Sequence, residues 1–229
     1  AFDNKDAVYG ADYMNGFDII NTTNLHITTA GADTLGSLSV PDYWIWDILF
    51  DNNQTTWLRG VNYFAWKKEN EKKYTVVKSI EGFPGKITPS FIRLIGKQHI
   101  AIGIPGLGTL IYNSQTLEKT GVIRNFSPNS ASLIEVRDIA LKGDVAYLAT
   151  PNSIIAGSYQ DDKWVFAREY KVPAFAGTVV NSIICDRNNT VWAGTNNGLF
   201  KINLNTGKVF QYQVMPGKTR WLEDNTIRH

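Results

Sequence analysis

The sequence predicts an all-β protein, a β-propeller of four-stranded antiparallel blades, because three of its features agree. Short runs of residues that favour β-strands recur about every 45 residues. Residues typical of turns separate these runs, and no segment with a helical period lies between them. Each unit therefore contains about four short strands, and a period of this length is typical of propeller blades.

Large apolar side chains mark the period. Counting back from Trp192 in steps of 45 residues reaches Tyr147, Ile102 and Trp57, and a last step of 48 reaches Tyr9. One four-stranded sheet cannot bury both of its apolar faces alone, so we expect these anchors to fill the layers between neighbouring blades. A β-sandwich also contains many short strands, but it would not keep this phase over five copies.

Turn residues keep the same phase as the anchors. Asp3, Asp51 and Asp186 each lie six residues before an anchor, where a carboxylate can accept backbone N–H groups of a tight turn. Polar hairpins follow the second apolar run of each unit, as at residues 113–115 and 205–207. We expect a single domain over residues 1–229, with blade units at about 1–33 plus 222–229, 43–78, 90–125, 134–170 and 179–214.

The two ends of the sequence fit one blade between them. Residues 3–6 have the pattern of a first turn whose innermost strand is missing, and residues 222–229 have the pattern of an innermost strand. About five blades are therefore compatible with two arrangements, a closed five-blade ring or an arc of a larger propeller. An open arc would leave two apolar faces exposed to water, which is unfavourable without a partner.

Composition excludes several classes of partner. The 229 residues carry 23 Lys and Arg against 21 Asp and Glu, so the net charge of +2 gives no reason to expect nucleic acid as a partner. No run of 18 apolar residues occurs, and we expect no membrane insertion by this chain. The single cysteine, Cys185, has no partner for an internal disulfide, and zinc-type spacing is absent. No cofactor and no metal are expected.

One unit carries a family resemblance. Residues 181–186 read NSIICD and residues 188–199 read NNTVWAGTNNGL. This resembles the two-component regulator propeller repeat, whose pattern is roughly an Ile-rich strand, Asp, a turn, Leu-Trp-Ile-Gly-Thr, a short turn and Gly-Leu. Residues 224–228 resemble the start of that repeat, whereas the match is weaker around Trp57 and Tyr9 and degenerate around Ile102 and Tyr147.

The resemblance implies a location and a role. Such repeats are typical of the sensor regions of bacterial hybrid histidine kinases, which lie outside the inner membrane and often respond to glycans. They also occur in secretion and surface proteins of the same bacteria. The sequence departs from the family in having five units where rings usually have seven blades, and it contains no kinase, receiver or transmembrane part.

Catalytic chemistry finds little support in the sequence. The three histidines are scattered, and none forms a nucleophile motif with Cys185 or a serine. The stretch from Asp51 to Trp57 is similar to the Asp-box of sialidases, but the Asp is one residue too far from the Trp and the leading Ser is missing. A propeller glycosidase or lyase stays an alternative, with Asp12, Asp47 and Glu135 as its candidate carboxylates. We expect no enzyme and assign no catalytic residue.

A ligand would lie where two sets of loops meet at one rim of the blades. The turns between second and third strands supply Tyr13, Arg59, Asn152, Asn196 and Asn197, and the connections between blades supply Trp44, Arg220 and Trp221. Aromatic rings beside Arg and Asn suit sugars, because rings stack on them while amides and guanidinium groups bind hydroxyls. Of the pair Trp44 and Trp46, we expect one ring to be buried and the other to lie nearer the rim.

These observations predict a non-catalytic β-propeller that senses or binds a ligand in the periplasm or at the cell surface of a bacterium, as part of a two-component-type regulator. The expected partner is an oligosaccharide or another small ligand. A protein-interaction scaffold of a surface or secretion assembly is the first alternative, and the propeller enzyme is the second.

Overall fold

The computed structural model describes residues 7–12, 16–31, 39–42, 44–128, 133–171, 177–213 and 226–227. Within these ranges the regular elements are all β-strands: β1 (Ala7–Asp12), β2 (Gly16–Asn21), β3 (Ile27–Ala30), β4 (Ile45–Phe50), β5 (Thr56–Gly60), β6 (Tyr63–Lys67), β7 (Thr75–Val77), β8 (Phe91–Ile95), β9 (His99–Ile104), β10 (Gly108–Asn113), β11 (Lys119–Ile123), β12 (Asp138–Lys142), β13 (Val145–Ala149), β14 (Ile154–Gln160), β15 (Lys163–Tyr170), β16 (Val180–Cys185), β17 (Thr190–Thr195), β18 (Gly198–Asn203) and β19 (Val209–Tyr212).

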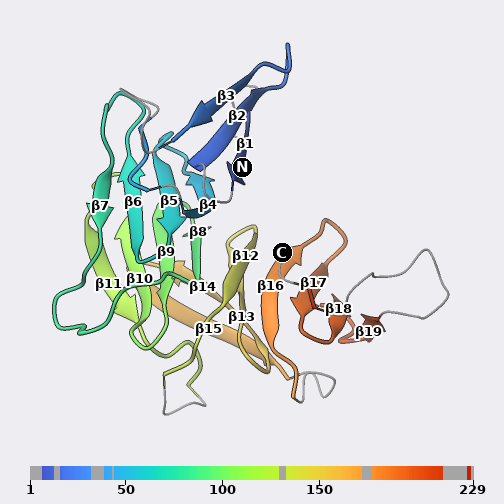
Figure 1. Cartoon of the computed structure of the whole chain (residues 1–229). Helices are drawn as coiled ribbons and strands as arrows, with labels where there is room; N and C mark the ends of the chain where they lie inside the picture. Colours follow the sequence, from blue (N-terminus) through green and yellow to red (C-terminus); the bar gives the residue numbers. More distant parts are fainter. Residues whose placement is uncertain are drawn as a thin grey trace. The chain divides into compact units, whose positions relative to one another are not determined.

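The strands form small sheets in which each strand pairs with the next one in sequence. Four sheets have four strands each, namely β4–β7, β8–β11, β12–β15 and β16–β19, and the sheet β1–β3 has three (Figure 1). In β17, Trp192 lies opposite Ile184 of β16 and Lys201 of β18. Five antiparallel meanders of this kind are the blades of a β-propeller, so the predicted fold class is confirmed. The two predicted arrangements, a closed five-blade ring and an arc of a larger propeller, stay predictions.

The chain divides into two compact units. The first consists of Ala1–Leu94, Gln98–Leu107 and Ile111–Lys119, and the second of Ile95–Lys97, Gly108–Leu110 and Thr120–His229. The sheets β1–β3 and β4–β7 belong to the first unit and β12–β15 and β16–β19 to the second, whereas residues of β8–β11 contribute to both. The single domain and its blade limits stay predictions.

The first sheet begins with the strand that carries an anchor. Tyr9 lies in β1, at the edge of its sheet, whereas Trp57 and Trp192 lie in the second strands of theirs. Residues 3–6 and most of residues 222–229 lie outside the described residues. Of the C-terminal segment, Ile227 is described: its N–H donates to the Thr195 carbonyl at 2.7 Å, and the Asn181 side chain donates to the Ile227 carbonyl at 3.0 Å.

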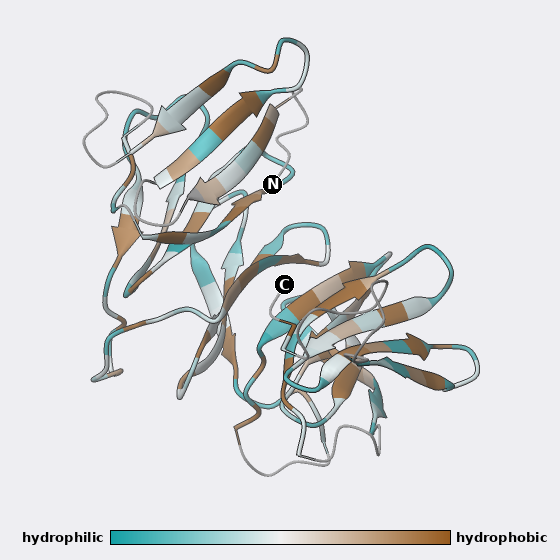
Figure 2. Cartoon of the chain, turned by 45° about the vertical axis from the view of Figure 1, so that its right-hand side comes forward, coloured by the Kyte–Doolittle hydropathy of each residue, from teal (hydrophilic) through white to brown (hydrophobic). Residues whose placement is uncertain are grey.

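Apolar side chains of neighbouring sheets pack together. In the first unit, Phe17, Ile45 and Leu58 belong to a cluster built from β1–β3 and β4–β7. In the second unit, Tyr147 and Phe200 belong to a cluster built from β12–β15 and β16–β19. Figure 2 shows the apolar colouring concentrated on the strands, with many turns hydrophilic. Each large side chain buried in this way contributes roughly 1.5–3 kcal/mol.

The anchors differ in how deeply they are buried. Trp57 and Ile102 are fully buried and Tyr147 is nearly so, whereas Tyr9 and Trp192 are partly buried. The Trp192 ring instead stacks with the Tyr212 ring, at 5.9 Å between centroids, and lies under the Lys201 ammonium group. The sequence pattern therefore located the packing positions but not the extent of their burial.

Polar hairpins join the last two strands of three sheets in a repeated manner. Asn21, Asn113 and Asn203 end β2, β10 and β18, and each side-chain oxygen accepts the backbone N–H groups two and three residues further on at 2.8–3.1 Å. The residue four positions on has positive φ in all three hairpins, being Leu25, Leu117 or Gly207, and it donates to the carbonyl of the asparagine. The asparagine fixes the turn because its side chain imitates a backbone acceptor.

Glycine is required where the strands before these hairpins begin. Gly16, Gly108 and Gly198 open β2, β10 and β18 with φ between 97° and 118°. A Cβ atom on Gly198 would overlap the carbonyl oxygen of Tyr212, at the end of the fourth strand, and one on Gly16 would overlap that of Ala30 in the same way. These positions therefore need glycine both for φ and for the close approach of the neighbouring strand.

Gly198→Ala is expected to lower the free energy of unfolding by at least about 2 kcal/mol, because alanine resists this φ and its methyl group displaces the last strand. Gly207→Ala is the matched control, since Gly207 also has positive φ (69°) but open space around it. Urea unfolding of both variants checks the prediction. Equal losses would show that the contact with Tyr212 contributes nothing.

Candidate functional site

The structure describes five of the eight predicted ligand-binding residues. Tyr13, Arg220 and Trp221 lie outside the described residues and stay predictions. Trp44 is half-buried just before β4, and Arg59 lies in β5. The remaining three lie in turns between second and third strands, as predicted: Asn152, Asn196 and Asn197.

The two asparagines of the β17–β18 turn are tied into local structure. The Asn196 side chain accepts the N–H of Val179 at 2.8 Å. The backbone and side-chain oxygens of Asn197 accept the side-chain amides of Gln211 and Gln213 at 2.8 and 2.9 Å. These bonds tie the turn to the residue before β16, to β19 and to the residue after β19. Asn152, in contrast, is exposed in the turn between β13 and β14.

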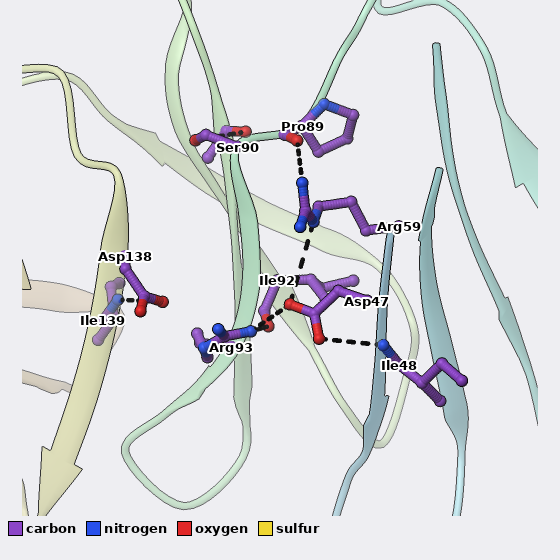
Figure 3. Close-up of polar contacts among 10 residues, drawn as sticks. Asp47, Ile48, Arg59, Pro89, Ser90, Ile92, Arg93, Asp138 and Ile139 are labelled. Carbon is purple, nitrogen blue, oxygen red and sulfur yellow. Dashed lines mark hydrogen bonds and ion pairs between the residues drawn. The ribbon is translucent and has the colours of Figure 1, made fainter. Parts of the chain in front are cut away.

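Arg59 does not lie in an exposed loop, contrary to the expectation from the sequence. It is a residue of β5 and only 6% exposed. Its Nη1 donates to the carbonyl of Pro89 at 3.1 Å, and its Nε lies 4.0 Å from Oδ2 of Asp47 (Figure 3). A buried guanidinium group needs such acceptors because burial removes its hydration. The turn of this repeat begins only at Val61, so Arg59 lies in the strand that precedes the turn, and its part in ligand binding stays a prediction.

A second arginine joins this group. Arg93 of β8 forms an ion pair with Asp47 through Nη1 and also donates to the carbonyl of Ile92 at 2.9 Å (Figure 3). The Asp47 side chain is 22% exposed and the Arg93 side chain 29%. The other carboxylate oxygen of Asp47 accepts the N–H of Ile48 at 3.1 Å. One carboxylate on β4 therefore faces guanidinium groups from two other strands.

An indole ring completes the group. The bulge in β4 between Ile45 and Asp47 turns Trp46 outward, so that the residue is 42% exposed. The guanidinium carbon of Arg59 lies 5.4 Å from the centre of the Trp46 ring. Trp46 is therefore the ring nearer to solvent, and Trp44 the more buried member of the predicted pair. We call Trp46, Asp47, Arg59 and Arg93 the Asp47 cluster.

The residues of the Asp-box resemblance have a structural role. Oδ1 of Asp51 accepts the N–H groups of Asn53 and Thr55 at 2.8 and 3.0 Å, and Oδ2 accepts the indole N–H of Trp57 at 2.9 Å. Asp51 thus closes the turn between β4 and β5 and holds the anchor ring. Its carboxylate is engaged on both oxygens and only 2% exposed, which does not suit proton transfer to a substrate.

Asp186 repeats this arrangement in the last sheet. Its carboxylate accepts the N–H groups of Asn188 and Thr190 and the indole N–H of Trp192, at 2.7, 3.1 and 3.2 Å. Desolvation raises the pKa of this carboxyl, but these three hydrogen bonds and the charge of Lys142 outweigh it and leave the pKa below its usual value. The aspartate six residues before an anchor therefore closes a turn in both of these repeats, at Asp51 and at Asp186.

Other reactive groups do not gather into a site in the part of the chain that the structure describes. No group of three or more His, Cys, Asp or Glu side chains there could hold a metal ion. The thiol of Cys185 is free, and desolvation raises its pKa to about 11 although the charge of Lys142 opposes this. Among the candidate carboxylates, Glu135 pairs with Arg137 at 3.2 Å, and Asp47 pairs with arginine as described above.

Comparison with known proteins identifies a repeat and a fold. Residues 174–197 match the family model described as "Two component regulator propeller". No curated protein matches the sequence of the chain. No helix among the described residues is both long and apolar enough to cross a membrane.

Solved structures share the fold at low sequence identity. Two crystal structures of the extracellular domain of BT4673 from B. thetaiotaomicron, provisionally assigned in one as a one component system and in the other as a hybrid two component system, align with TM-scores of 0.72 and 0.70, each at 17% identity over 100% of this chain. The corresponding domain of BT3049 from the same organism aligns with a TM-score of 0.66 at 12% identity over 98% of the chain. This chain spans 29% of the length of each of these structures.

A third protein links the fold to a surface assembly. PorZ of Porphyromonas gingivalis, a surface component of the type-IX secretion system, aligns with a TM-score of 0.57 at 13% identity, over 96% of this chain and 26% of its own length.

The family match confirms the resemblance that the sequence predicted. The chain carries a two component regulator propeller repeat at residues 174–197, within a fold that it shares with extracellular domains of bacterial two component systems.

Proposed function

We propose that the chain is a ligand-binding sensor propeller of a bacterial two-component-type regulator, located outside the inner membrane, non-catalytic and responsive to glycans. The family match and the fold shared with extracellular domains of such systems support a sensor role. The observation that carries the ligand-binding part is the Asp47 cluster, in which an exposed indole ring lies beside buried and half-exposed arginines.

The chemistry of this cluster suits saccharides. A sugar ring has an apolar face that packs on an indole, and Trp46 offers a partly exposed one. Carboxylate and guanidinium groups bind hydroxyls as acceptors and donors, and Asp47 and Arg93 are both partly reachable by solvent. An extended saccharide could thus stack on the ring and exchange hydrogen bonds with the charged groups next to it.

The test is calorimetric titration of the 229-residue chain with a panel of neutral and acidic oligosaccharides. We expect at least one of them to bind, and we expect Trp46→Ala to weaken that binding about tenfold, because it removes one stacking contact. Phe210→Ala is the control, since Phe210 is an aromatic residue 57% exposed in β19. The proposal fails if no saccharide binds at millimolar concentration, or if both substitutions have the same effect.

The likeness to PorZ favours a second candidate, a protein-interaction scaffold in a surface or secretion assembly. A scaffold would leave every oligosaccharide of the panel unbound. A propeller enzyme would bind an oligosaccharide and shorten it, so chromatography of the titrated saccharides after overnight incubation separates the enzyme from the sensor.

A further inference from the structure

One edge strand is longer than all the others. Strand β15 ends the sheet β12–β15 and has eight residues, whereas the outermost strands β3, β7, β11 and β19 have three to five. The outward backbone groups of an edge strand can pair with a further strand, and proteins commonly limit this by keeping their edges short. Among the strands that the structure describes, β15 therefore offers the longest edge for such pairing.

The β14–β15 hairpin fixes which backbone groups of β15 point outward. Asp161 and Asp162 both have positive φ, 48° and 58°, and form a two-residue turn between the strands. The pair that flanks such a turn is hydrogen-bonded, and hydrogen-bonded and non-hydrogen-bonded pairs then alternate. Lys163 belongs to the flanking pair, so Trp164 and Phe166 direct their N–H and C=O groups away from β14. Beyond them a bulge interrupts the alternation.

The side chains along this edge are accessible as well. Val165 is 50% exposed although it is a large apolar residue. Ala167 is exposed, and Trp164 and Phe166 are half-buried. The Trp164 indole is held in place, since its N–H donates to the Phe126 carbonyl at 2.8 Å and its ring meets the Phe126 ring edge-on. A further strand can therefore pair with β15 without a change of fold.

The sequence of β15 is complementary to itself in the antiparallel direction. If Val165 lies opposite Val165 of a second copy, Trp164 lies opposite Phe166 on both sides of the centre. The outward residues then form two hydrogen-bonded pairs, with about four hydrogen bonds in all. A register centred on Trp164 or Phe166 would align only one such pair, because the turn and the bulge end the regular stretch.

The same register also matches the side chains. It places β-branched valines opposite each other on one face of the sheet and an indole opposite a phenyl ring on the other. Cross-strand pairs of both kinds stabilise antiparallel strands. Backbone and side chains thus favour one occupant for this edge, which is β15 of another copy.

We propose that β15 is a self-association edge, at which two copies of this chain pair antiparallel around Val165 and continue the sheet from one copy into the other. The same residues meet from both sides, so the contact closes at two copies and does not extend into a filament. It buries little area beyond the two strands, as weak and transient interfaces do, and we expect a dissociation constant on the order of 0.1 mM. This inference concerns assembly and does not depend on the proposed ligand.

Sedimentation velocity of the full chain at about 5 µM to 500 µM tests the association, and we expect the average mass to rise with concentration toward that of two chains. Val165→Lys should weaken the association at least about tenfold, because it sets two like charges opposite each other. Val122→Lys is the matched control, since Val122 is a 36% exposed valine on β11, the outermost strand of another sheet. It should leave the association unchanged. Far-UV circular dichroism verifies that both variants fold.

Amide hydrogen exchange locates the contact in the unaltered chain, so it stays decisive if Val165→Lys does not fold. We expect the N–H groups of Trp164 and Phe166 to exchange about threefold more slowly at the highest concentration than at the lowest, because most copies are then paired. The N–H groups of β11 should exchange at the same rate at both concentrations.

Three results would each overturn the inference. The first is a chain that sediments as a single copy at the highest concentration. The second is an association that both lysine variants weaken equally. The third is an association in which the N–H groups of Trp164 and Phe166 exchange at a rate that does not depend on concentration, since the contact then lies elsewhere.

Discussion

Trp57→Ala is expected to lower the free energy of unfolding by about 3–5 kcal/mol, the largest effect of any single substitution considered for this chain. The Trp57 side chain is fully buried. Its ring contacts those of Trp66 and Tyr112, with centroids 5.3 and 6.0 Å away, and its indole N–H donates to Asp51. Alanine would leave a cavity between these rings and an unused acceptor on a buried carboxylate.

Urea unfolding followed by circular dichroism measures this loss, and Trp46→Ala is its control. Both substitutions remove one indole, but Trp46 is 42% exposed, so its loss should cost about 1 kcal/mol or less. Trp57→Ala could fail to fold, in which case Trp57→Phe keeps the prediction testable with a smaller loss. If the two alanine variants unfolded at the same urea concentration, Trp57 would not be a core anchor.

Asp51→Ala should lower the free energy of unfolding by about 3 kcal/mol. The substitution removes three hydrogen bonds and leaves two buried donors, the N–H of Thr55 and the indole N–H of Trp57, without an acceptor. Each buried donor left in this state costs about 1–3 kcal/mol. The aspartate thus stabilises both the turn between β4 and β5 and the orientation of the anchor ring.

The chain contains its own comparison for this effect. Asp186→Ala removes the equivalent three hydrogen bonds, but the Trp192 ring there is only partly buried, so water can replace some of them. Urea unfolding should therefore show a clearly smaller loss for Asp186→Ala than for Asp51→Ala. The reverse order would mean that the repeated aspartate does not act through the buried indole.

Much of the fold could be predicted from the sequence because its determinants are local. An aspartate six residues before an aromatic anchor closes a turn, and an asparagine at the end of a third strand closes a hairpin. Both devices act within a few residues, so they recur in the sequence with the period of the blades. The confirmed fold class follows from this recurrence.

The candidate site could be predicted only in part, because its contacts are not local. The sequence predicts Trp44 and Trp46 as a pair and Arg59 as a ligand residue, and the part of Arg59 in binding stays a prediction, but the sequence gives no signal for Arg93. Arg93 meets Asp47 across 46 residues of sequence, and no local pattern reports such a contact. Residue type alone predicts Asn196 and Asn197 as ligand residues, whereas the Asn196 side chain and the backbone and side-chain oxygens of Asn197 form hydrogen bonds that hold their own turn.

The central claim is that each repeat folds into an antiparallel sheet of consecutive strands with its anchor in a fixed register. Measurement of nuclear Overhauser effects between backbone protons in the isotope-labelled chain tests it most directly. The account predicts contacts of Trp192 with Ile184 and Lys201, and of Tyr147 with Ala140 and Ala156. The claim would be contradicted if the backbone protons of an anchor instead paired with those of a strand from another repeat, or gave the sequential pattern of a helix.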